Sequence, residues 1–237
     1  MTQLRSSGST RLETHISHFF ASERWDDLSV YLGHLSHSDF RSVSSLLSDT
    51  FLPQLTDTSY WEAFTKIVPL NPKAYLVTFL KAAVILRKNE KLSLDNPLFI
   101  EYTQGLVREN RSIDIGKTIE LLLPTSSSPE EASAFINLFA LPSTDKMKAL
   151  YRAHTTASYY LLFEELRRSE HDTSIIKSYI SLLIKRKERI DYNLAAILSK
   201  YFGIAIPGIT FSLRIEDFKL SYIATSYETF SKVLHSI

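Results

Sequence analysis

Cysteine is absent from the 237-residue sequence, and glycine is scarce. Without cysteine the chain can have no disulfide bond, no thiolate metal site and no thiol nucleophile. Six glycines and eight prolines are few for a β-sandwich or a nucleotide-binding α/β protein, because both classes need glycine in their turns. The composition therefore favours helices joined by short polar loops.

The chain also has little net charge, only +1. A chain so close to neutrality gives no reason to expect a polyanion bound over its whole surface. Residues 1–10 contain no apolar run of the kind found in a secretory signal peptide, so we interpret them as a flexible terminus. Together with the absence of cysteine, this terminus favours a cytoplasmic protein.

Long apolar runs are missing as well. The most apolar stretch, residues 71–89, is interrupted by Thr78 and Lys81 and is shorter than the ~20 apolar residues that a bilayer crossing takes. We therefore expect no membrane insertion. Pro72 behind Asn71 is typical of a helix start, and a helix without a polar face is one surrounded by other helices. The stretch is thus predicted to be a central core helix, with no domain boundary near residue 90.

Most of the remaining sequence shows apolar residues at helical spacing, bounded by capping residues and prolines. The predicted helices cover residues 10–21, 23–35, 39–47, 58–68, 71–89, 96–109, 112–123, 128–141, 143–168, 173–187, 191–202 and 225–235. The helix at 143–168 either continues or breaks near His154. We predict an all-α fold of antiparallel helix pairs in a single domain over residues 11–237, with residues 172–237 as a C-terminal subdomain in the alternative division.

The pattern changes after residue 203. Ile209, Phe211, Leu213 and Ile215 alternate with polar residues, which is the two-residue period of a β-strand. We predict a small β-like segment near residues 204–215 that packs against the last helices.

A repeat of helix pairs is suggested by two tryptophans, Trp25 and Trp61, which lie 36 residues apart. Predicted helices also begin near residues 23, 59, 96 and 130. This rhythm resembles the ~34-residue period of tetratricopeptide-type arrays, in which helical hairpins stack. The resemblance covers the period only, because Arg41 stands where such a repeat has a small residue. It implies a short α-solenoid whose concave surface binds a partner.

Motifs that would carry chemistry are not recognisable. Gly116-Lys117-Thr118 resembles the end of a phosphate-binding P-loop, but Arg111 stands in place of its first glycine and the surrounding pattern is helical. No nucleophile elbow and no zinc-protease motif is present. We therefore expect a non-catalytic protein.

Four histidines have a spacing that can serve a metal ion. His15 and His18, and likewise His34 and His37, are three residues apart and could face one ion if their helices form a hairpin. We interpret them instead as residues at the edge of the core. The sequence predicts no metal ion and no cofactor.

Basic residues gather in one part of the chain. Residues 146–200 carry 11 Lys or Arg against 6 Asp or Glu, a net of +5, whereas residues 1–145 carry 13 against 17. Tyrosines lie between these cations, and basic residues interleaved with aromatic ones can hold a nucleic-acid strand. The predicted binding residues are Arg167, Arg168, Lys185, Arg186, Lys187 and Arg189.

The same region resembles a winged-helix module. In that resemblance residues 191–202 are the recognition helix and residues 204–215 are the wing. Pro207-Gly208 interrupts the standard helix-turn-helix form. The function predicted from the whole sequence is a protein–protein interaction module or scaffold that binds another protein. The alternative is a nucleic-acid-binding protein that uses the basic region at 146–200.

Overall fold

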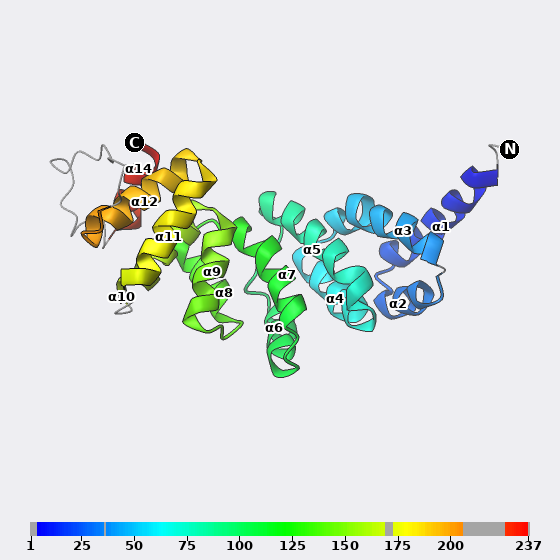
Figure 1. The fold of residues 1–237 in the computed structure, drawn as a ribbon. Coiled ribbons are helices and arrows are strands. Elements are labelled where there is room, and N and C mark those ends of the chain that lie inside the picture. The colour runs from blue at the N-terminus through cyan, green and yellow to red at the C-terminus, as the bar shows by residue number, and fades with distance from the viewer. Residues whose placement is uncertain (1–3, 36, 169–172, 206–225, 237) are drawn as a thin grey trace. The chain divides into compact units, whose positions relative to one another are not determined.

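The computed structural model of the protein describes residues 4–35, 37–168, 173–205 and 226–236. All secondary structure in these residues is helical (Figure 1). The all-α prediction is therefore confirmed. The β-like segment predicted near 204–215 lies, from residue 206 onward, outside the described residues. Within the described ranges, no helix combines the length and the apolarity that crossing a bilayer requires.

The helices follow the predicted order, and most ends agree within a few residues. The first helix begins at Leu4 and not near residue 10; serine and glycine, common in residues 6–9, favour caps and turns and gave no helix signal there. The α-helices are α1 (Leu4–Ala21), α2 (Trp25–Gly33), α3 (His37–Leu46), α4 (Asp57–Ile67), α5 (Pro72–Lys88), α6 (Pro97–Arg108), α7 (Ser112–Leu122), α8 (Pro129–Asn137), α9 (Ser143–Ala153), α10 (Thr156–Arg168), α11 (Thr173–Arg186), α12 (Arg189–Tyr201) and α14 (Tyr227–Ser236). Short turns of other helix types are η1 (Leu47–Phe51), η2 (Leu52–Gln54), η3 (Val68–Leu70) and η4 (Leu123–Thr125).

Side-chain caps explain several of these boundaries. Asn96 caps α6, since its side chain accepts a hydrogen bond from the backbone N–H of Leu98 in the first turn. At α4 the cap is Thr56, whose Oγ1 accepts from the backbone N–H of Ser59 at 3.3 Å. The stretch at 143–168 breaks between α9 and α10, where His154 has a left-handed backbone with φ of 55°.

The contacts within the chain form two compact units. Unit 1 consists of Met1–Thr125 and Phe135–Ala140, and unit 2 consists of Ser126–Ala134 and Leu141–Ile237. The sequence analysis predicts no domain boundary near residue 90, and this residue lies inside unit 1. The single domain over 11–237, and the alternative subdomain at 172–237, stay predictions.

Helix α5 lies at the centre of unit 1. It contacts α3, α7 and all four of the short turns η1 to η4. Eight of its residues are buried, whereas Lys81, which interrupts its apolar stretch, is exposed. The prediction of a core helix at 71–89 is confirmed.

Helices α2 to α7 of unit 1 form two rows beside each other. Helices α2, α4 and α6 contact one another in series, and so do α3, α5 and α7 (Figure 1). Aromatic rings hold α4 both across the rows and within its own row: the ring centroid of Phe64 lies 5.7 Å from that of Phe79 in α5 and 4.8 Å from that of Tyr102 in α6. Trp61 packs on Phe99 at 4.4 Å. Close-packed rings of this kind fix the spacing between α4 and its neighbours.

We predict that Phe64→Ala destabilises unit 1 by about 3–5 kcal/mol, the usual cost of removing a buried aromatic ring. Phe64 is fully buried, whereas Ile113 in α7 is 73% exposed. Ile113→Ala is therefore the matched control and should change stability by less than about 0.5 kcal/mol. Urea unfolding of the full chain, followed by circular dichroism, measures both. Equal losses in the two variants would show that the aromatic layer does not hold the unit.

Candidate functional site

The carboxylate of Asp191 is the only acidic side chain with no exposed surface in the part of the chain whose burial is described. Asp191 lies in the first turn of α12, where an acidic side chain is stabilised by the positive end of the helix dipole. A buried charge nevertheless costs several kcal/mol unless it is paired and hydrogen-bonded. The residues around Asp191 are therefore the first place to look for a site.

One oxygen of this carboxylate, Oδ1, faces a tyrosine and an arginine. The hydroxyl of Tyr159 in α10 donates a hydrogen bond to Oδ1, and Nη1 of Arg186 lies 3.8 Å from the same oxygen. Nη1 of Arg186 also donates to the hydroxyl of Tyr159 and to the carbonyl of Tyr151, both at 3.1 Å. The guanidinium carbon lies 3.9 Å from the ring centroid of Tyr151, which is a cation–π contact.

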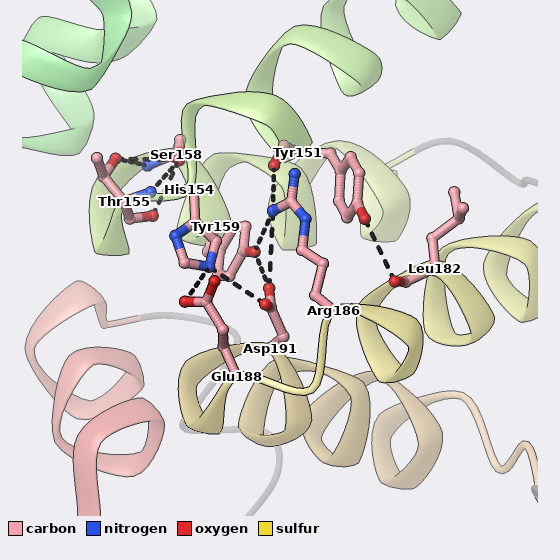
Figure 2. Close-up of polar contacts among 9 residues, drawn as sticks. All are labelled: Tyr151, His154, Thr155, Ser158, Tyr159, Leu182, Arg186, Glu188 and Asp191. Carbon is pink, nitrogen blue, oxygen red and sulfur yellow. Dashed lines mark hydrogen bonds and ion pairs between the residues drawn. The ribbon is translucent and has the colours of Figure 1, made fainter.

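The other oxygen, Oδ2, faces the histidine at the α9–α10 break. Nε2 of His154 is 3.2 Å from Oδ2 of Asp191 and 3.4 Å from Oε2 of Glu188. Figure 2 shows the three side chains converging, with His154 on one side and the two carboxylates on the other. The left-handed backbone of His154 turns the chain here, and Ser158 and Thr155 cap the start of α10 beside it.

Burial keeps the tyrosines of this cluster in their neutral, donating form. The pKa of Tyr159 is raised well above its usual value, first by burial and then by the hydrogen bond to the negative Asp191. Burial also raises the pKa of Tyr151, although the nearby Arg186 guanidinium opposes the shift. A phenol is protonated at neutral pH even without such a shift, and the raised pKa extends the neutral form to higher pH, so Tyr159 donates to Asp191.

Chemically, this cluster holds charge: it brings two carboxylates, an imidazole and a guanidinium together. It joins the α9–α10 break to the turn between α11 and α12 through Asp191, Arg186 and His154. Nε2 of His154 and one oxygen each of Glu188 and Asp191 lie within 4.8 Å of one another, the spacing of atoms that can share a metal ion. Among the described residues this is the only such group of three or more.

The six predicted binding cations lie at two places in unit 2. Arg167 and Arg168, at the end of α10, pair with Glu164 at 2.7 Å and 3.7 Å. The other four lie around the α11–α12 turn, where Arg186 belongs to the Asp191 cluster and Nη2 of Arg189 is 3.5 Å from the carbonyl of His235. Lys185 and Lys187 are exposed. Whether these six residues bind a partner stays a prediction.

Of the four N-terminal histidines, His15, His18 and His34 have described side chains, and none of these three belongs to a group of three or more possible metal ligands. The ring of His15 stacks on Tyr31 with centroids 5.7 Å apart, and His18 and His34 are exposed. The side chain of His37 lies outside the described residues.

Sequence reasoning missed His154, Tyr159, Glu188 and Asp191 as a set. Tyr159 and Asp191 are 32 positions apart, and His154 and Asp191 are 37 apart, so no local spacing links them. The sequence held one signal, the predicted helix break near His154. Unusual backbone conformations at such breaks are common in binding and catalytic sites.

A second candidate site lies on unit 1, on the side where α2, α4 and α6 contact in series. A hollow of about 490 Å³ lies between α2 and α4, and one of about 380 Å³ lies between α4 and α6. Thr65, Lys66 and Leu98 line both hollows. The two thus adjoin, and together they are called the α2–α4–α6 groove below.

The part of this groove between α2 and α4 is acidic. Its charged lining residues are Glu23, Arg24, Asp26, Asp27, Glu62 and Lys66. Arg24 pairs with Asp27 at 2.5 Å, and Lys66 pairs with Asp26 at 2.9 Å. Glu23 and Glu62 have no cation paired with them within the described ranges, so this part has a surplus of two negative charges.

Two polar atoms beside the groove are buried without a hydrogen-bond partner among the described residues. They are Nε1 of Trp25, which lines the α2–α4 part, and the hydroxyl of Tyr102, which lines the α4–α6 part. Burial raises the pKa of Tyr102 to about 12, so its hydroxyl keeps its proton. Both atoms are therefore donors with no acceptor in the described structure.

Comparisons of the chain with protein-family models, with curated proteins and with solved structures found no match.

We predict that Arg186→Ala lowers the stability of unit 2 by about 2–3 kcal/mol, because it leaves the buried Asp191 carboxylate without its cation. Lys185→Ala, at the neighbouring exposed position, should change stability by less than about 0.5 kcal/mol. Thermal and urea unfolding of the full chain measure the difference. Similar stabilities for the two variants would mean that Arg186 is a surface cation and not part of a structural cluster.

Proposed function

We propose that the chain is a non-catalytic protein-binding module that holds a segment of another protein in the α2–α4–α6 groove. The observation that carries the proposal is the groove itself, which runs over three successive helices of one row. A surface shared by several helices suits an extended or helical segment better than a small compact ligand.

The proposal includes a short α-solenoid in unit 1. Its support is the pair of rows, with α2, α4 and α6 contacting in series on one side and α3, α5 and α7 on the other. Stacked helical hairpins place equivalent helices next to one another in this way. The helices of the first row begin at residues 25, 57 and 97, so the intervals are 32 and 40 and the hairpins differ in length.

The chemistry of the groove indicates the kind of segment. Its acidic part favours Lys or Arg side chains, because Glu23 and Glu62 are not paired with a cation there. Apolar lining residues, among them Leu98 and Pro69, provide contact for an aliphatic or aromatic anchor. We therefore assign the groove to a basic segment that carries an apolar anchor.

The unpaired donors strengthen this assignment. A buried donor without an acceptor costs about 1–3 kcal/mol. A bound segment that offers backbone carbonyls near Trp25 and Tyr102 recovers part of that cost, provided that the lining side chains move enough to admit it. Peptide binding thus has a specific gain here that an ordinary solvated surface lacks.

Nucleic-acid binding is the alternative proposal, and the fold of unit 2 favours it less. In the winged-helix resemblance the recognition helix is residues 191–202, yet all side chains from Asn193 to Ser199 are buried. Of the six predicted cations, Arg167, Arg168 and Arg186 are paired with carboxylates. A buried helix and neutralised cations leave few groups for phosphate contacts.

Site-specific photo-crosslinking tests the protein-binding proposal. A photoreactive residue is placed at Glu62 or Glu101, both exposed and lining the groove, and at the control positions Lys81 in α5 and Glu120 in α7. After irradiation in cells, the groove positions should give an adduct of defined mass that the control positions lack. Mass spectrometry should map the adduct to a segment with more Lys and Arg than Asp and Glu.

A synthetic peptide of the mapped segment then gives the decisive comparison. We expect Glu62→Lys to weaken its binding about tenfold, a change of ~1.4 kcal/mol, and Glu120→Lys to leave it unchanged. Equal adducts at groove and control positions, or a peptide that binds Glu62→Lys as well as the wild type, would contradict the proposal.

A further inference from the structure

We propose that His154, Glu188 and Asp191 in unit 2 form a binding site for a divalent transition-metal ion, with Zn²⁺ as the best fit. The site is independent of the groove on unit 1 and of the partner proposed for it. It rests on the distances between the three ligand atoms, on the way Asp191 is held, and on the exposure of the three side chains.

The distances are those of ligands around one ion. Zinc lies about 2.0–2.2 Å from a histidine nitrogen or a carboxylate oxygen, which places neighbouring ligand atoms of a tetrahedral or octahedral site roughly 3–3.5 Å apart. Nε2 of His154 is 3.2 Å from Oδ2 of Asp191 and 3.4 Å from Oε2 of Glu188. The two carboxylate oxygens lie within 4.8 Å of each other, so all three atoms are near the spacing of ligands around one ion.

Hydrogen bonding alone explains this arrangement less well. Nε2 of an imidazole carries at most one hydrogen, so it can donate a linear bond to only one of the two carboxylates. The 3.2 Å contact with Oδ2 of Asp191 is within hydrogen-bond range, whereas the 3.4 Å contact with Oε2 of Glu188 is longer than an ordinary N–H···O bond. The nitrogen thus faces a position between two carboxylate oxygens, where a cation would contact all three atoms.

The surroundings of Asp191 orient it for this role. The Tyr159 hydroxyl and Arg186 both lie at Oδ1, which leaves Oδ2 directed at His154. Metal-binding carboxylates are commonly held in this way by hydrogen bonds to their second oxygen. When His154 is neutral, the two carboxylates and the Arg186 guanidinium together carry a charge of −1. This net negative charge attracts a metal cation.

Exposure and ligand type indicate the class of ion. Asp191 has a side-chain exposure of 0%, His154 of 28% and Glu188 of 60%, so the site opens to solvent beside Glu188 and leaves room for water ligands. An imidazole together with two carboxylates suits Zn²⁺ better than Mg²⁺ or Ca²⁺, which prefer oxygen ligands alone. We therefore expect Zn²⁺ to bind and Mg²⁺ not to compete with it.

Calorimetric titration with Zn²⁺ tests the site, using the full chain after treatment with a chelator and its removal. The wild type should bind one Zn²⁺ per chain and melt at a higher temperature with Zn²⁺ than without it. Glu188→Gln should weaken the binding at least about tenfold and reduce the shift in melting temperature at the same Zn²⁺ concentration. Because Glu188 is exposed, this variant is expected to fold.

Glu228→Gln is the matched control, since Glu228 is an exposed glutamate of unit 2 whose ion pair is with Lys232 in α14. It should bind Zn²⁺ as the wild type does. His154→Asn, which tolerates the left-handed backbone, should behave as Glu188→Gln does. No binding by the wild type, or equal binding by the wild type and Glu188→Gln, would overturn the proposal and leave the cluster as an ion-pair network without a metal.

Discussion

The buried carboxylate of Asp191 is the constraint on which the described part of unit 2 depends. A buried charge destabilises the fold unless other segments of the chain supply an opposite charge and hydrogen-bond donors. Here they come from α10, from the end of α11 and from the α9–α10 break, through Tyr159, Arg186 and His154. Helix α12 is buried along Asn193–Ser199, directly after the first turn that carries Asp191, and it packs on α11 and α14.

Unit 1 depends on a different constraint, the packing of aromatic rings between its two rows of helices. Tyr60, Trp61 and Phe64 all lie on α4 and are fully buried, and they contact rings of both α5 and α6. Such a layer fixes the separation of α4 and α6, and the hollow between them follows from that separation. The groove is thus a consequence of core packing, while its acidic rim is set by surface residues that the core does not require.

The sequence predicted the helices well because their signals are local. Proline at the start of α5 and asparagine before α6 mark boundaries by backbone chemistry alone. Neither candidate site could be predicted, since each joins residues from several helices. Arg186 was selected as a surface cation from its place in a basic run, but its environment is set by Tyr159 and Asp191, which only the fold brings beside it. Likewise, helical spacing indicates that the rings of Trp25 in α2 and Tyr102 in α6 face the core. It does not indicate that Nε1 of Trp25 and the hydroxyl of Tyr102 have no hydrogen-bond partner among the described residues.

For unit 2 we propose above all that the Asp191 carboxylate contacts Tyr159 and Arg186 through Oδ1 and a metal ion through Oδ2. Anomalous diffraction at the zinc absorption edge, from crystals of the full chain grown with Zn²⁺, tests it most directly. If Asp191 binds zinc in this way, the anomalous map should show one strong peak between Nε2 of His154, Oε2 of Glu188 and Oδ2 of Asp191. Tyr159 and Arg186 should still lie at Oδ1. A zinc peak elsewhere, or none at this position, would contradict it.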